Sequence, residues 1–564
     1  MEMSMPRHKL KFSYSRVLSH LRKIAVTVGL KTPFPSRILL CICLISPISN
    51  TKIYGNTNQK KVRLSPSSQL RQQFLAIKKS YRMGDLSSQA AWERLDKLAN
   101  KGSLLSSADR VGLLQTQATL LQDAGFPILA SIFASQALKT AERPLERSLT
   151  PTWEMLQQIS ERKPIQTILE IVAEQVPLKG RNPPSFKSNW NYIVGNAAAR
   201  RGDLAMAIQN YSQVRIQDKY FLPAKYQQAM IYVDQNQLDK AENALKSILM
   251  IEDTSSVTSG AESELLDYTM LALGRIFYEK GKFEESIKSY RLVNKNGPNF
   301  YDALFEQSWA FFMGGYPMHA LGAIHGAESP FFSQVFNPEA TMLRSMIYYW
   351  LCRYDESRNA LADFMEKHAA AIEELNEFLD RQRSDYEVGY QLFENMISGV
   401  SGQSLGLHHS ILKTNAERDS MLFLRDQYAA VVEEKTRLNT KGIYGSRESI
   451  GRAQDYLDRW MTSLRREIGK RFLAELSETK KDYDRLYAQA QFLYVELLMS
   501  EKDQILGKSL HASTKITKVA QQLKVSGWAD KTQAWKDSRT GEYWWDEVGY
   551  YITPVGSKCQ GTGP

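Results

Sequence analysis

The sequence predicts an all-helical protein: a solenoid of paired helices, then long helices, then an aromatic-rich C-terminal tail. Three observations support this fold class. Small and aromatic residues recur between Asn189 and Val335 with a period of about 34 residues. No proline occurs between Pro338 and Pro554, so long helices are allowed there. Four of the ten tryptophans lie near the C-terminus, from Trp528 onward.

This period places the same kind of residue at the same point of each helix pair. Adding 34 to Gly202 and to Gly281 gives Asn236 and Gly315, which would occupy equivalent turns. Small residues let the two helices of each pair approach closely, and they are Gly195, Ala229, Gly274 and Ser308 on the first helices and Ala207, Ala241, Ser286 and Ala320 on the second. Such a period is typical of tetratricopeptide repeats, which bind other proteins.

Five such repeats are predicted within residues 188–366. Four span about 188–221, 222–255, 267–300 and 301–334, with a polar loop between the second and third. The fifth follows a three-residue slip, because Tyr354 matches Phe283 at an offset of 71.

The residues before this array are predicted to be degenerate helical repeats over 65–150, with the clearest copy from Val111 to Pro144. Prolines punctuate the connection at 151–187, which we expect to contain short helices and to act as a hinge.

Residues 1–55 are predicted to be an export signal or an N-terminal anchor. Positions 1–50 hold eight Lys or Arg against one acid, and they include an apolar run from Ile38 to Ile48 that follows these basic residues. That run is about half of the ~20 residues that a spanning helix requires, which favours export to the periplasm or the outer membrane. Because this segment carries +7 of the net charge of +11, the basic composition does not indicate nucleic-acid binding.

Residues 367–510 are predicted to form long helices. Apolar residues recur at three- and four-residue spacing from Ile450 through Leu457, Leu464 and Ile468, which predicts a helix of about 50 residues. Its apolar stripe must pack against another helix. A bundle within the chain is favoured over an intermolecular coiled coil, because the heptad breaks after Ile468.

The tail, residues 511–564, carries too much aromatic surface for a disordered segment. We expect it to fold back on the helical body or to dock on a partner. Cys352 is predicted to lie within a helix as a buried thiol, and this is favoured over a disulfide with Cys559.

The run Gly541 to Tyr551 (GEYWWDEVGYY), closing on Ser557, Lys558 and Cys559, resembles the C-terminal signature of exported tetratricopeptide proteins of gliding and predatory delta-class proteobacteria. The nearest group is the adventurous gliding motility protein T family. This resemblance implies a scaffold, periplasmic or associated with the outer membrane, in an envelope complex for motility. It supplies no catalytic residues.

A groove along the first helices of the repeats is the predicted binding site for an extended peptide or a helix of another envelope protein. Its aromatic, Asn and Arg side chains would contact that partner, with Arg275 and Trp309 as the preferred contacts. The predicted protein-binding residues are Asn189, Tyr192, Asn196, Arg200, Tyr226, Met230, Tyr268, Arg275, Tyr278 and Trp309.

No enzymatic site, cofactor or metal is predicted. Ser404 lies in a Gly-x-Ser-x-Gly run, but the strand-turn-helix that such a nucleophile needs is not predicted around it. The eight histidines lack a metal-binding spacing. The sequence leaves two alternatives open: an exported cell-wall hydrolase with a site near Ser404 or Glu542, and a periplasmic chaperone for outer-membrane proteins, which would need an open apolar groove.

Overall fold

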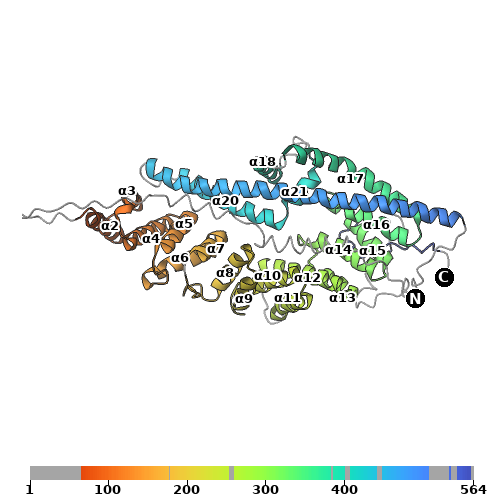
Figure 1. Cartoon of the computed structure of the whole chain (residues 1–564), viewed down its shortest axis with the longest axis horizontal. Coiled ribbons are helices and arrows are strands. Elements are labelled where there is room, and N and C mark those ends of the chain that lie inside the picture. Colours follow the sequence, from red (N-terminus) through yellow and green to blue (C-terminus); the bar gives the residue numbers. More distant parts are fainter. Residues whose placement is uncertain are drawn as a thin grey trace, which may run out of the picture. The chain divides into compact units, whose positions relative to one another are not determined.

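The computed structural model describes residues 65–176, 178–252, 260–382, 385–399, 407–440, 447–506, 533–534 and 543–559. The predicted all-helical class is confirmed over these residues (Figure 1). Their only strands are the two-residue segments β1 (Gln533–Ala534) and β2 (Tyr551–Ile552), which pair in parallel. The predicted signal at residues 1–55 lies outside the described residues.

Most of the chain consists of helices that follow one another as pairs joined by short turns. The pairs are α2 (Pro66–Arg82) with α3 (Ser88–Ala99), α4 (Ser107–Asp123) with α5 (Pro127–Thr140), α8 (Asn189–Arg200) with α9 (Leu204–Ser212), α10 (Phe221–Asp234) with α11 (Leu238–Glu252), α12 (Gly260–Glu279) with α13 (Phe283–Arg291), α14 (Phe300–Met313) with α15 (Pro317–Ala327), and α16 (Pro338–Trp350) with α17 (Tyr354–Gln382).

The remaining helices lie between or after these pairs. They are α6 (Thr150–Ser160), α7 (Gln166–Gln175), α18 (Tyr386–Ile397), α19 (His409–Ala416), α20 (Asp419–Thr440) and α21 (Arg447–Ile505), with the short 3-10 segments η3 (Gly102–Leu104), η4 (Arg147–Leu149) and η5 (Pro330–Phe332).

The turns within the pairs confirm the register that the sequence predicts. Gly202, Gly281 and Gly315 have φ between 69° and 85°, and Asn236 has a φ of 57°. Left-handed backbone is accessible to glycine without strain and is tolerated by asparagine. The equivalent position of the fifth pair is Cys352, with a φ of 55°. Cys352 therefore ends a helix in a turn, and its predicted place within a helix is wrong.

The small residues at the helix interfaces also recur in register. A Cβ atom added to Gly195 would lie 2.5 Å from the Tyr211 ring, and one added to Gly274 would lie 2.5 Å from the Tyr290 ring. These glycines leave room for a tyrosine of the second helix. In the fifth pair, the hydroxyl of Ser345 donates to the backbone carbonyl of Ser357 at 2.9 Å. Small side chains thus bring the paired backbones together, as the sequence predicts.

The described residues fall into two compact units. The N-terminal unit contains residues 65–224 and Leu422–Glu467, and the C-terminal unit contains Lys225–Met421 and residues from Ile468 onward. The division therefore falls within α10, α20 and α21. The proline-rich connection at 151–187, predicted to be a hinge, does not separate the units; there Trp153 packs against Trp190 and Phe186 in a buried aromatic cluster.

In the N-terminal unit, α20 and the first part of α21 pack against the early helix pairs. Glu434 of α20 accepts hydrogen bonds from the backbone N–H groups of Ile128 and Leu129, at 2.9 and 2.7 Å, in the first turn of α5. The Tyr456 ring of α21 packs on Phe133, with centroids 5.3 Å apart. A carboxylate at a helix N-terminus satisfies donors that have no partner within the helix.

In the C-terminal unit, the second part of α21 packs against α18 and α19. Gly389 and Gly469 allow close approach, because a Cβ on either would overlap the other helix. The Phe472 ring packs on Phe393, with centroids 5.7 Å apart. Helix α21 has 59 residues, close to the predicted length. Its predicted packing within the chain is confirmed separately in each unit.

Candidate protein-binding surfaces

The predicted groove residues of the N-terminal unit are used for packing between helices. Tyr192 is buried and stacks on Tyr220, with centroids 4.8 Å apart. The buried Asn196 accepts a hydrogen bond from the Tyr211 hydroxyl at 2.8 Å. Arg200 lies 2.8 Å from the Glu170 carboxylate. Asn189, at the start of α8, is half-buried.

In the C-terminal unit, Arg275 and Trp309 link neighbouring pairs. Arg275 is fully buried, and its guanidinium donates two hydrogen bonds to Glu306 on the next pair, at 2.7 and 2.6 Å. The Trp309 indole N–H donates to Glu339 on the following pair at 3.0 Å. Their polar groups are thus directed to the chain itself.

The other predicted contacts behave in the same way. Tyr226 and Met230 are buried, and the half-buried Tyr268 and Tyr278 pack on aromatic neighbours, Tyr226 and Phe283 respectively. None of the ten predicted residues is exposed. The prediction of an open polar groove at these positions is therefore not supported: Tyr226, Arg275 and Trp309 contact the next helix pair, and the other residues are buried or half-buried.

The described part of the tail, residues 543–559, docks on the chain's own C-terminal unit. Val548 and Tyr551 belong to the same hydrophobic core as α14, α15 and α16. The backbone N–H of Thr553 donates to the carbonyl of Met318 at 3.1 Å, and that of Lys558 to the carbonyl of Leu351 at 2.9 Å. Of the two predicted outcomes for the tail, packing on the body is the one observed for these residues.

The tail backbone reaches α15 because the helix presents glycine at the crossing. A Cβ on Gly322 would overlap the carbonyl of Tyr551. Beside this crossing, the His325 ring stacks on Tyr543, with centroids 4.8 Å apart. Burial, with a smaller effect of Arg344, lowers the pKa of His325 to about 4, so this ring is neutral at physiological pH.

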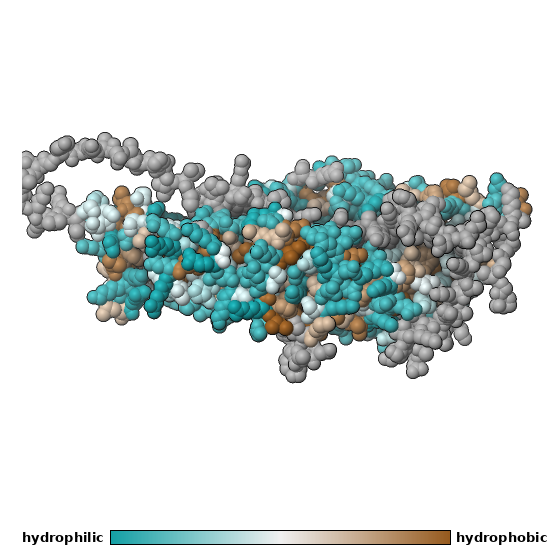
Figure 2. Space-filling view, turned by 60° about the horizontal axis from the view of Figure 1, so that its bottom comes forward, coloured by the Kyte–Doolittle hydropathy of each residue, from teal (hydrophilic) through white to brown (hydrophobic). Residues whose placement is uncertain are grey.

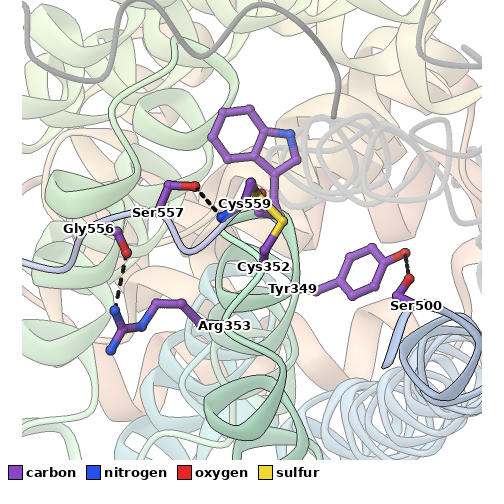
Figure 3. Close-up of a disulfide and its surroundings, with 8 residues drawn as sticks. Tyr349, Cys352, Arg353, Ser500, Gly556, Ser557 and Cys559 are labelled. Carbon is purple, nitrogen blue, oxygen red and sulfur yellow. Dashed lines mark hydrogen bonds between the residues drawn. A yellow bond between two sulfur atoms is a disulfide. The ribbon is translucent and has the colours of Figure 1, made fainter. Parts of the chain in front are cut away.

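A disulfide joins Cys352, in the turn between α16 and α17, to Cys559 in the tail (Figure 3). Around it, the Arg353 guanidinium donates to the carbonyl of Gly556 at 3.1 Å. The prediction of a buried thiol at Cys352 is wrong. The repeat register carried the missing signal: the offset that relates Tyr354 to Phe283 also relates Cys352 to Gly281, so Cys352 belongs in a turn rather than a helix.

The largest group of exposed apolar side chains lies at the end of α21. Leu486, Ala490, Leu493 and Leu497 face the core, whereas seven large apolar side chains on the remaining surface are more than a third exposed. These are Tyr487, Phe492, Tyr494, Val495, Leu498, Met499 and Leu506. We call Tyr487, Tyr494, Val495, Leu498 and Met499 the outer face of α21. Apolar residues gather at the upper right of Figure 2, where Figure 1 shows this helix ending.

Exposed apolar patches of this kind mark interaction sites. Sequence reasoning missed the outer face because it followed only one apolar stripe, which begins at Ile450 and continues along the buried side of the helix through Leu486 and Leu493. The signal was present in the sequence: from Tyr487 to Met499, α21 is apolar on more than one side, which a helix buried along a single stripe does not require.

The catalytic alternatives are not represented in the described structure. Ser404 and Glu542 lie outside the described residues. Within the described ranges, no group of three or more His, Cys, Asp or Glu side chains could hold a metal ion. Among the described helices, none combines the length and apolar composition that crossing a bilayer requires.

The structure defines an all-helical protein of repeat-like architecture with a disulfide-tethered tail and an exposed apolar helix face. No protein-family model matches the chain, and no curated protein matches its sequence.

Proposed function

We propose that this chain is a non-enzymatic scaffold of tetratricopeptide type in a bacterial envelope complex, exported to the periplasm or to the outer membrane. The observation that carries the binding role is the outer face of α21, a row of exposed apolar side chains on a rigid helix. A rigid helix that presents apolar side chains is a common way for a protein to bind another.

The tetratricopeptide assignment is supported by the recurring helix pairs. The contact of Gly195 with Tyr211 is repeated two pairs later by Gly274 with Tyr290, and left-handed turns recur in register along the array. The predicted groove residues are buried or half-buried. We therefore place the partner contact on exposed surface, such as the outer face of α21, and no longer on the first helices of the repeats.

Export is supported by the disulfide. Disulfides persist in oxidising compartments such as the periplasm and are rare in the cytosol. The order of basic and then apolar residues within positions 1–50 agrees with this location. A role in gliding motility depends on the resemblance of the tail, and its partners would then be other envelope proteins of that complex.

Fractionation combined with thiol labelling tests the location. We expect the tagged chain in the periplasmic or outer-membrane fraction, with Cys352 and Cys559 protected from alkylation until dithiothreitol is added. A cytoplasmic chain with both thiols free would contradict the proposal.

Photo-crosslinking in intact cells tests the scaffold role. A benzoylphenylalanine at Val495 should give adducts that contain a second envelope protein, identified by mass spectrometry. The matched control is the same probe at Leu75, an exposed leucine of α2 that lies outside the outer face. Adducts only between two copies of this chain would make the outer face a self-association surface and remove its support for partner binding, and absence of any intermolecular adduct at Val495 would remove that support as well.

A further inference from the structure

The outer face of α21 has a charge at each end. Asp484 lies just before Tyr487, and Lys502 lies just after Met499. Both side chains are exposed, and Asp484 forms a surface ion pair with Lys480 of the preceding turn at 2.6 Å. We propose that two copies of this chain associate through antiparallel pairing of their α21 outer faces.

The helical geometry places the two charges on the same line. Positions 484 and 502 are separated by about five turns of about 3.6 residues, so both point in the direction of Val495, on the side away from the core. We call the outward side of α21 between Asp484 and Lys502, which includes the outer face, the strip. It is about 27 Å long, at about 1.5 Å per residue. The strip therefore begins with an acid and ends with a base.

This order of charges makes the strip complementary to itself only when the helices run in opposite directions. Position 493 is midway between 484 and 502. A two-fold axis at the level of position 493, on the outer side of the helix, brings Asp484 of each copy to Lys502 of the other. The same axis places Gln491 opposite Val495, and the small Ala488 opposite Leu498. Parallel pairing would instead oppose Asp484 to Asp484 and Lys502 to Lys502, which is unfavourable. An isologous contact of this kind closes after two copies.

The composition of the strip favours a protein partner over a lipid surface. Interfacial helices bind anionic headgroups through lysines and arginines that flank an apolar face. Here Lys480 and Lys481, one turn before the strip, are paired with Asp484 and Glu478, an acid lies on the line of the apolar face, and Gln491 lies near its centre. Tyrosine and methionine, represented by Tyr487, Tyr494 and Met499, are enriched where proteins meet proteins. The proposal rests on the same outer face as the proposed function and names its occupant as a second copy of this chain; the purified chain tests the dimer, and crosslinking in cells tests for other partners.

The first test measures self-association of the full exported chain by sedimentation equilibrium. We expect a monomer–dimer equilibrium for the wild type. Val495→Asp puts a charge in the centre of the strip and should weaken dimerisation by about ten-fold or more. Leu75→Asp, at a similarly exposed leucine, is the control and should leave the equilibrium unchanged. Circular dichroism should show the same helical content for all three.

Charge reversal tests the antiparallel arrangement. Asp484→Lys alone opposes lysine to Lys502, and Lys502→Asp alone opposes aspartate to Asp484, so each variant should dimerise more weakly than the wild type. When the two single variants are mixed, both ion pairs are restored and a heterodimer should form. The double variant should regain the wild-type equilibrium. No structural effect of a single variant would produce this recovery.

Three results would overturn the proposal. The first is a wild-type chain that stays monomeric at about 100 μM, a concentration at which even weak specific complexes are populated. The others are a dimer that Val495→Asp does not weaken, and charge variants that do not recover dimerisation on mixing. A crosslink from position 495 only to residues of the same molecule, with no adduct between two molecules, would assign the strip to an intramolecular contact and also overturn the proposal. Binding of the monomer to phosphatidylglycerol vesicles, lost in Val495→Asp, would assign it to a membrane. Failure of the dimer leaves the scaffold role to its own experiments.

Discussion

Gly322 lies where the tail crosses α15, and the tail can reach the helix because this residue has no side chain. A Cβ at this position would overlap the backbone carbonyl of Tyr551, which cannot move as a flexible side chain could. We predict that Gly322→Ala displaces the tail and lowers the free energy of unfolding by about 1–3 kcal/mol. Hydrogen exchange of residues 543–559 should become faster.

Gly556→Ala is the matched control for this prediction. It also lies in the tail region, but a Cβ there meets open space, so neither stability nor exchange should change by a comparable amount. Unchanged exchange of the tail in Gly322→Ala would show that the close approach at α15 does not hold the tail in place.

Glu434 caps α5 from a buried position, and its titration should affect stability. Burial raises its pKa from 4.5 to about 7, although the N–H groups of Leu129 and Ile128 and the charges of Arg437 and Lys163 act in the opposite direction. A raised pKa means that the stability linked to this group is complete below pH 4.5 and is lost as the pH rises through 7. The loss is at most about 3 kcal/mol.

We therefore predict that Glu434→Gln gains stability relative to the wild type between pH 5 and pH 8, measured by urea unfolding at each pH. Glu433→Gln is the control, because Lys163 lowers the pKa of Glu433 and that group stays ionised over the same range. A difference between Glu434→Gln and the wild type that is constant with pH would contradict the shifted titration.

At the scale of elements, the disulfide holds the tail to the turn that follows α16. It joins residues 207 positions apart, and disulfides that close long loops typically contribute about 2–4 kcal/mol. We predict that Cys559→Ser destabilises the C-terminal unit and speeds hydrogen exchange in residues 543–559. Wild-type protein treated with dithiothreitol should behave in the same way. Equal exchange in all three samples would mean that packing of Val548 and Tyr551 alone retains the tail.

The helix pairs could be predicted from the sequence because their determinants are local and repeated. Gly195 and Gly274 must be small for the second helix to approach, and the turn at Gly281 needs left-handed backbone. These requirements recur from one helix pair to the next, so a single chain displays them several times. The long α21 was predictable for a similar reason, since one apolar stripe continues through it.

The groove prediction was less successful because an arginine or an aromatic residue can either bind a partner or pack against the chain's own next helix. Periodicity places Arg275 and Trp309 on the first helices of their pairs, and from this we expected contacts with a partner. It does not reveal that Glu306 and Glu339 lie on the neighbouring pairs to receive them. An arginine that binds a partner and one that binds the next helix have the same spacing. The tail contacts were equally hidden, because α15 and Tyr551 are far apart in sequence and no repeat relates them.

At the scale of the whole molecule, the chain has two compact units, and the two single-residue predictions fall in different ones. Gly322 and Tyr551 belong to the C-terminal unit, whereas Glu434 and its α5 partners belong to the N-terminal unit. Substitutions without shared partners are usually additive within about 0.5 kcal/mol. We therefore predict that the double variant Gly322→Ala with Glu434→Gln shows the sum of the two single effects.

Calorimetry with unit-resolved hydrogen exchange measures this independence. Gly322→Ala should reduce protection in Lys225–Met421, whereas Glu434→Gln should alter protection in the described residues up to 224. Helices α10, α20 and α21 each contribute residues to both units, so they are the elements through which coupling would be transmitted. If the double variant departs from additivity by more than about 1 kcal/mol, the units unfold as one cooperative body and the helices shared by both units transmit stability between them. Additivity would show instead that each unit depends on its own core.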